Sequence, residues 1–105
     1  MNATASLDRY VVDVLMRDLI GHDRRPAAFL VYVFLATRDA EDQLPPSHAA
    51  LAERIGLSRR AVQEALRHLS ERGLIERERV ALTEPARIRI LAPWRERGSE
   101  GRHFP

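Results

Sequence analysis

The chain has 105 residues, a length that suits one compact domain with one core rather than two. Hydrophobic residues make up 45% and charged residues 30%, a balance typical of a folded globular protein and not of a disordered one. The chain has no cysteine, which excludes disulfides and thiolate metal sites, and its longest apolar run, residues 26–36, is too short to cross a membrane. Its first residues lack the features of a signal peptide, so a cytoplasmic location is expected.

The net charge of +2 is unevenly distributed along the chain. Residues 1–46 hold 5 arginines against 7 acidic residues, whereas residues 47–105 hold 12 arginines against 8 glutamates. Because a polyanion is attracted to local excess positive charge, any contact with one is expected in the second half.

The first predicted element is an N-terminal helix over residues 6–21. Within Leu7–Ile20, apolar residues recur at the i, i+3, i+4 spacing that puts them on one face of an α-helix. Ser6 is expected to cap this helix, and Gly21 is expected to end it in a left-handed conformation.

A second helix is expected over residues 24–38. Asp23 is a candidate N-cap, Pro26 suits a first turn, and residues 27–36 are apolar on nearly every side. A helix without a polar face needs cover on most sides, from the N-terminal helix or from a partner subunit. The acidic segment 39–46 ends in two prolines and is interpreted as a solvated loop.

Residues 47–72 carry the most informative pattern, two short helices joined by a glycine turn. Ser47 and Ser58 suit helix N-caps, and Gly56 suits a turn residue with positive φ. The positions expected to face inward are small or apolar: Leu51, Ala52, Ile55, Leu57, Val62, Ala65, Leu66 and Leu69. This spacing predicts a helix-turn-helix.

A β-hairpin is expected directly afterwards, over residues 74–91. Gly73 suits the position after a helix end, and Leu74–Val80 and Arg87–Leu91 alternate apolar with charged residues. Trp94 is expected to pack the last strand onto the body, and residues 95–105 are expected to form a flexible tail. The predicted fold is therefore mainly α with a small β-hairpin, a winged helix-turn-helix with an extra N-terminal helix in one domain, residues 1–105.

Residues 46–75 resemble bacterial winged-helix DNA-binding domains. They are similar to MarR-type and GntR-type regulators and to helix-turn-helix domains of phage or plasmid replication proteins. With the preceding helix and loop, the resemblance covers roughly residues 26–91. The chain departs from these families at Ala61, where a threonine that touches phosphate is frequent. The resemblance implies binding of double-stranded DNA, in the role of a transcription factor, and implies no cofactor.

The residues expected to contact DNA lie on the second helix of the motif and around it, since the N-terminal part of such a helix reads bases in the major groove. Arginine and glutamine side chains match guanine and adenine edges, and a glutamate can accept from cytosine or restrain an arginine. Serines at helix N-termini suit phosphate oxygens, and arginines on the wing suit the minor groove. These residues are Ser47, Arg54, Ser58, Arg59, Arg60, Gln63, Glu64, Arg67, Arg79 and Arg87.

The same charges have another interpretation. Arg60 and Glu64, like Arg67 and Glu71, have the i, i+4 spacing of ordinary surface ion pairs. For any single arginine, DNA contact and a surface ion pair are equally expected. For the polar face of residues 59–67 as a group, its position directly after the turn favours DNA contact.

A homodimer is expected through the Leu7–Ile20 and Ala27–Ala36 helices, because they carry more apolar surface than so small a domain can hide. One alternative is the DNA-binding module of a replication or mobile-element protein. Another is a winged helix used for protein–protein contact, which the near balance of arginine and glutamate on the wing favours.

An enzyme is not expected, since no nucleophile motif, phosphate loop or metal-ligand spacing is visible, and no effector site is identifiable. The expected location is the cytoplasm, at the nucleoid.

Overall fold

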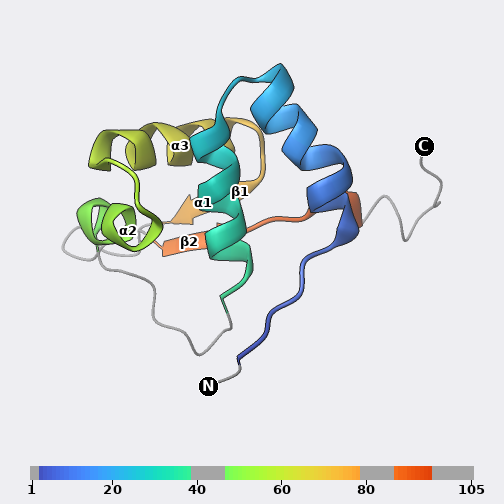
Figure 1. The fold of residues 1–105 in the computed structure, drawn as a ribbon, viewed down its shortest axis with the longest axis horizontal. Helices are drawn as coiled ribbons and strands as arrows, with labels where there is room; N and C mark the ends of the chain where they lie inside the picture. Colours follow the sequence, from blue (N-terminus) through green and yellow to red (C-terminus); the bar gives the residue numbers. More distant parts are fainter. Residues whose placement is uncertain (1–2, 39–46, 79–86, 96–105) are drawn as a thin grey trace.

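The computed structural model describes residues 3–38, 47–78 and 87–95. In these ranges the elements follow in the order η1 (Val11–Leu15), η2 (Arg17–His22), α1 (Pro26–Ala36), α2 (His48–Ile55), α3 (Arg59–Glu71), β1 (Ile75–Glu78) and β2 (Arg87–Ile90). Figure 1 shows α1 at the centre, with α2 and α3 on one side and the N-terminal helix on the other. The predicted fold class, mostly helical with a hairpin after the helix-turn-helix, is confirmed. None of the helices described is long and apolar enough to cross a membrane.

The N-terminal helix, residues 9–22, differs in winding from the α-helix that the sequence predicts. Most of it is π-helical, in the two segments η1 and η2. Its buried residues Val11, Leu15 and Leu19 follow one another at a strict spacing of four. In an α-helix of 3.6 residues per turn that spacing drifts around the axis, and the wider π turn offsets the drift. The winding therefore keeps all three side chains in the core.

Both predicted ends of this helix were wrong. Ser6 is exposed and precedes a helix that starts at Arg9, where no side chain caps the first turn. Gly21 lies inside η2 without positive φ, because the π-type hydrogen bonds continue to Asp23, whose N–H donates to the Asp18 carbonyl at 2.8 Å. The chain reverses at Arg24 instead, which adopts φ 58°.

Helix α1 begins at Pro26, as its fixed φ predicts, but its N-cap is Arg25 and not Asp23. The Asp23 side chain is used elsewhere, on α3. Helix α1 buries Ala28, Phe29, Val31, Tyr32 and Leu35, so it forms the centre of the core. It is not covered on every side, since Leu30 remains 49% exposed.

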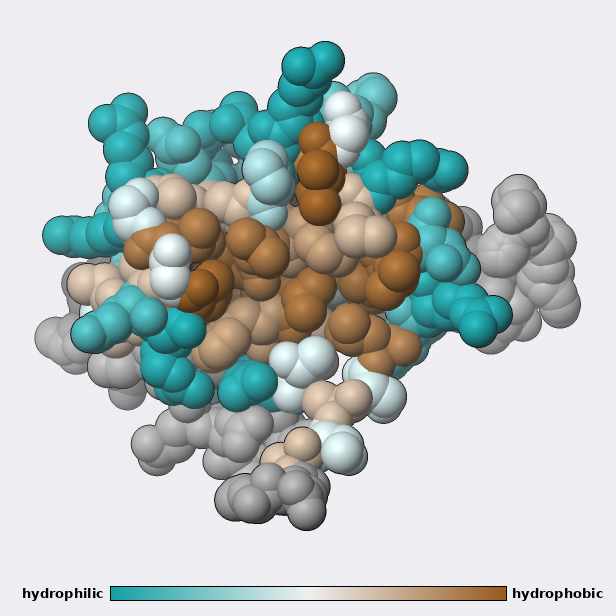
Figure 2. Space-filling view, in the orientation of Figure 1, coloured by the Kyte–Doolittle hydropathy of each residue, from teal (hydrophilic) through white to brown (hydrophobic). Residues whose placement is uncertain are grey.

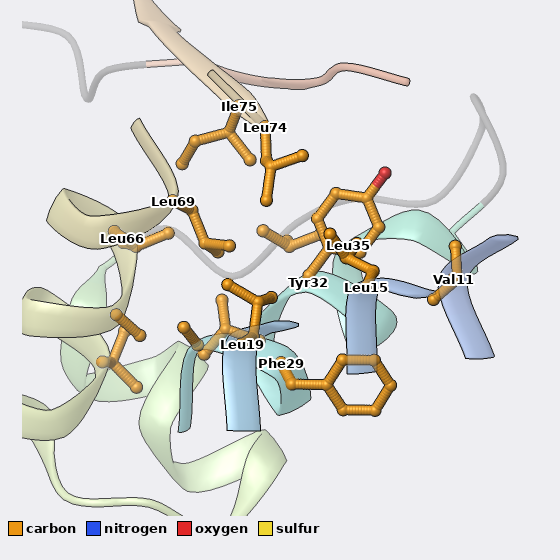
Figure 3. Close-up of a cluster of buried hydrophobic side chains, with 14 of the residues drawn as sticks. Val11, Leu15, Leu19, Phe29, Tyr32, Leu35, Leu66, Leu69, Leu74 and Ile75 are labelled. Carbon is orange, nitrogen blue, oxygen red and sulfur yellow. The ribbon is translucent and has the colours of Figure 1, made fainter. Parts of the chain in front are cut away.

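The core joins all the elements around α1. Figure 3 shows Tyr32 and Leu35 facing Leu69, Leu74 and Ile75, which come from α3 and the start of the wing. The Tyr32 hydroxyl donates to the Leu91 carbonyl at 2.9 Å, just after β2. Burial raises the pKa of Tyr32 to about 12, so this donor stays protonated at neutral pH.

The hairpin is antiparallel and pairs Ile75 with Ile90 and Glu78 with Arg87. Because side chains alternate along a strand, one face carries Ile75, Arg77, Ile88 and Ile90, and the isoleucines of this face pack on the core. The start of the hairpin is fixed by a Schellman turn at the end of α3. There Gly73 takes φ 74°, and the Leu74 N–H donates to the Leu69 carbonyl at 2.9 Å, as predicted for a glycine at this place.

Trp94 packs the segment after β2 onto the N-terminal helix. Its ring stacks on Tyr10 with centroids 4.6 Å apart, and its Nε1–H donates to Asp8 Oδ2 at 2.8 Å. Arg95, predicted to begin a flexible tail, instead donates to both carboxylate oxygens of Asp8, at 2.6 and 2.9 Å. The tail interpretation fails at this residue because a carboxylate lies within reach; residues 96–105 lie outside the described ranges.

Candidate nucleic-acid interface

The turn between α2 and α3 sets the position of the candidate interface. Ser47 Oγ accepts from the Ala50 N–H at 3.1 Å and Ser58 Oγ from the Ala61 N–H at 3.0 Å, so both serines are N-caps as predicted. Gly56 takes φ 91°, and the Ala52 carbonyl accepts from both the Gly56 and the Leu57 N–H. Ala52 itself is buried, which allows the two helices to approach closely.

Helix α3 presents one apolar face and one polar face. Val62, Ala65, Leu66 and Leu69 are buried, as the spacing predicts. On the opposite, outer face of α3, five polar residues are all exposed: Arg59, Arg60, Gln63, Glu64 and Arg67. A helix held from behind in this way is free to place its outer face against a large partner.

An open depression of about 780 Å³ lies along this polar face. It is lined by His48, Arg59, Arg60, Gln63, Glu64, Arg67 and Arg77. Four arginines against one glutamate give this surface a strong positive excess, which attracts a polyanion. Two of its residues, His48 at the start of α2 and Arg77 on β1, were not among the predicted contacts. Arg77 had a signal in the sequence, since it shares the strand face of Ile75 at a spacing of two.

Two of the arginines already have carboxylate partners on the same helix. Arg60 Nε lies 3.1 Å from Glu64 Oε2, and Arg67 Nη1 lies 3.2 Å from Glu71 Oε2, as the alternative interpretation predicted. Exposed pairs of this kind contribute only a few tenths of a kcal/mol, so a phosphate or base can replace either carboxylate. Within the described residues, Arg59 and Arg77 have no carboxylate within 4.0 Å.

The other predicted contacts are distributed around this depression. Ser47 and Ser58 are exposed, and each hydroxyl still has its proton to donate after accepting the capping N–H. Arg54 lies outside the depression, with its guanidinium 5.3 Å from the centre of the Phe34 ring. Arg87 lies on the opposite hairpin face from Arg77, next to the Glu76–Arg89 ion pair. Arg79 lies outside the described residues.

The far end of α3 is fixed by the carboxylate of Asp23, whose side chain is only 9% exposed and whose role the sequence did not reveal. Asp23 accepts hydrogen bonds from His22 Nδ1 and His68 Nε2, each at 2.8 Å, and forms an ion pair with Arg72, whose Nε lies 2.9 Å from Asp23 Oδ2. The hydrogen bond from His22, followed by that from His68 and the charge of Arg72, lowers the pKa of Asp23 to about 2 despite desolvation. The turn before α1 is thereby tied to the last turn of α3.

Within the ranges the structure describes, no group of three or more histidine, aspartate or glutamate side chains is placed to hold a metal ion. What the described surface offers is a helix with arginine and glutamine on its outer face, a preceding helix with a capped N-terminus, and a hairpin beside them. That arrangement defines a winged helix-turn-helix.

Comparison with known protein families matches residues 24–98 to the Crp-like helix-turn-helix domain. Since the match spans most of the chain, the protein belongs to this family and carries a bacterial helix-turn-helix DNA-binding domain. No curated protein and no solved structure matches the chain. The expected likeness to MarR-type and GntR-type regulators in particular stays a prediction.

Proposed function

We propose that the protein binds duplex DNA sequence-specifically as a homodimeric transcription factor, with α3 in the major groove. The observation that carries the proposal is the positive depression lined by the outer face of α3 and by Arg77. Family membership supports DNA binding, and the proposal adds the reading residues, the regulatory role, the dimer and a location at the nucleoid.

We assign a role to each residue on the outer face of α3 from its position on the helix and from the hydrogen-bonding groups of the base edges. Arg59 and Gln63 stand one helical turn apart near the start of α3, where base edges are read. Arg59 suits the O6 and N7 atoms of guanine, and Gln63 suits the N6 and N7 atoms of adenine. Arg60 is held by Glu64 in the free protein, so we assign it to whichever base or phosphate displaces that carboxylate.

Phosphate contacts position the helix on both sides. Ser47 and Ser58 donate their hydroxyl protons at helix N-termini, and Arg67 and Arg77 flank the groove. Arg54, Arg79 and Arg87 are proposed as outer contacts to the DNA backbone and the wing-side minor groove.

The experiment is selection of bound duplexes from a random library by the full chain, followed by salt titration on the selected duplex and on a scrambled one. Specific binding is expected, with log K falling against log salt by about 0.9 per phosphate contacted. Arg59→Ala should weaken the selected duplex by about 1–3 kcal/mol and relax preference at one base pair.

Arg25→Ala is the matched control, because it removes an exposed arginine outside the depression. Its effect should be small and equal on both duplexes. Absence of binding, with a flat salt response, would exclude DNA and favour the protein–protein alternative.

A further inference from the structure

The surface of the described residues has one large apolar area away from the outer face of α3. Val12 is 47% exposed, Ile20 40% and Leu30 49%, and all three lie on the N-terminal helix or α1. Figure 2 shows apolar surface running across the middle of the face that presents α1 and the N-terminal helix. Contiguous exposed apolar surface of this kind marks an interaction site.

The N-terminal helix organises this area into a stripe. Val12, Met16 and Ile20 follow one another at a spacing of four, directly beside the buried column of Val11, Leu15 and Leu19. The winding that keeps the buried column in the core therefore keeps the second column together at its edge. We call Val12, Met16 and Ile20 the outer stripe.

The charged residues beside the outer stripe favour one relative orientation of the two N-terminal helices in a dimer. Asp13 and Arg17 are exposed and follow Val12 and Met16 by one residue, so they lie on the same side of the stripe. Among the described residues, the carboxylate nearest to Arg17 is that of Asp18, at 4.0 Å, and the Arg17 side chain is 73% exposed. In a parallel pair of such helices, Val12, Met16 and Ile20 meet their equals, but the flanking Asp13 and Arg17 of the two copies lie on opposite sides of the seam and do not pair. In an antiparallel pair, Asp13 lies near Arg17 of the partner subunit, and Arg17 near Asp13 of the partner subunit.

We infer that the outer stripe binds the same stripe of a second copy in antiparallel direction, with the two-fold axis beside Met16. Val12 then packs near Ile20 of the partner subunit, and two Asp13–Arg17 ion pairs close the seam. An isologous two-fold contact requires a self-complementary surface, which the antiparallel order of these charges provides. This inference rests on the homodimer of the proposed function and gives it a geometry.

Charge reversal tests the contact on the full chain. Asp13→Arg should weaken dimerisation in sedimentation equilibrium by about tenfold or more, because each seam then brings two arginines together. Arg17→Asp should do the same, and the double variant Asp13→Arg/Arg17→Asp should restore the dimer. Glu53→Arg, an exposed change of the same type on α2, is the control and should leave the dimer intact.

Introduced cysteines test the direction, since the native chain has none. A mixture of Val12→Cys and Ile20→Cys chains should form a disulfide-linked heterodimer on mild oxidation, whereas each variant alone should crosslink poorly, because a disulfide needs Cα atoms within about 7 Å. Efficient crosslinking of Val12→Cys with itself would mean a parallel pair and would overturn the inference.

A native chain that is monomeric at high micromolar concentration would also overturn it. DNA binding is scored separately: a monomer that still binds a half-site refutes only the dimer, and a dimer that binds no duplex refutes only the DNA proposal. Far-UV circular dichroism of each variant checks that the fold is retained.

Discussion

Two glycines show how the backbone angle φ of a single residue determines whether replacing glycine by alanine lowers or raises the free energy of unfolding. Gly56 and Gly21 are alike in space, since a Cβ on either would meet no atom within 4 Å. They differ in φ, which is 91° at Gly56 in the helix-turn-helix and is not positive at Gly21 inside η2.

We therefore expect opposite effects from the same substitution. Gly56→Ala should lower the free energy of unfolding by about 1–2 kcal/mol, because an L-residue is strained in the left-handed region. Gly21→Ala should raise it by about 0.5–1 kcal/mol, because glycine inside a helix costs conformational entropy. Urea denaturation of the three proteins measures both values, and a loss of stability in Gly21→Ala would contradict the π-helical assignment of its backbone.

At the scale of elements, the local signals of the helix-turn-helix were sufficient to predict it. Ser58, Gly56 and Gly73 specify caps and turns through their own chemistry, and the apolar spacing on α3 specifies its buried face. The N-terminal helix was less predictable. Its spacing of four is compatible with α or π winding, and only docking against α1 decides between them.

The same distinction applies to the candidate site. The outer face of α3 follows from helical periodicity, so the sequence could predict that its five polar residues are exposed there. His48 and Arg77 join them because α2 and β1 fold back alongside α3. Strand alternation puts Arg77 on the face of Ile75, but only the tertiary structure places that face beside α3. Asp23 was misassigned for a related reason: its position before Pro26 suits a cap, while its partners His68 and Arg72 lie far along the chain.

The contacts of Asp23 with His68 and Arg72 make the free energy of unfolding depend on pH in the acid range. Asp23 has a pKa of about 2 in the folded protein and a higher one when unfolded, so its contribution is complete above about pH 4 and is lost as pH falls toward 2. Hydrogen bonds from Arg95 and then from Trp94 lower the pKa of Asp8 as well, so its contribution is lost on acidification in the same direction. Denaturant midpoints should therefore fall over this acid range.

Asp23→Ala should cost about 1–3 kcal/mol at neutral pH, because His68 and Arg72 lose a shared acceptor. It should also flatten the acid dependence. Glu53→Ala is the control, being an exposed carboxylate on α2, outside the proposed seam, with no ion pair among the described residues. A variant as acid-sensitive as the native protein would assign the effect to Asp8 alone.

At the scale of the whole molecule, α3 and the wing together form one electrostatic surface. Arg77 extends the positive depression from the helix to β1, whereas Arg89 on the opposite hairpin face is paired with Glu76. Arg77 therefore adds its positive charge to the side of the hairpin that faces α3.

Substitution of one arginine on each hairpin face should separate the effects of these faces. Arg77→Ala is expected to reduce the salt slope of DNA binding by about 1, equally on selected and scrambled duplexes, as for a phosphate contact. Arg89→Ala, on the other face, should change the slope much less. Equal effects of the two would show that the wing does not bind with its α3-facing side.

The contact of Trp94 and Arg95 with Asp8 also has a consequence for the order in which the protein folds. Trp94 and Arg95 lie 86 and 87 positions after Asp8 in the sequence, so forming this contact closes a loop of nearly all the residues between residues 1 and 105. Loops of this length are costly to close early, and the contact is expected to form after the rate-limiting step. Trp94→Ala should then speed unfolding while leaving the refolding rate nearly unchanged, which stopped-flow chevron plots would resolve. During synthesis, the N-terminal helix emerges before the helix-turn-helix and, on this view, docks after it.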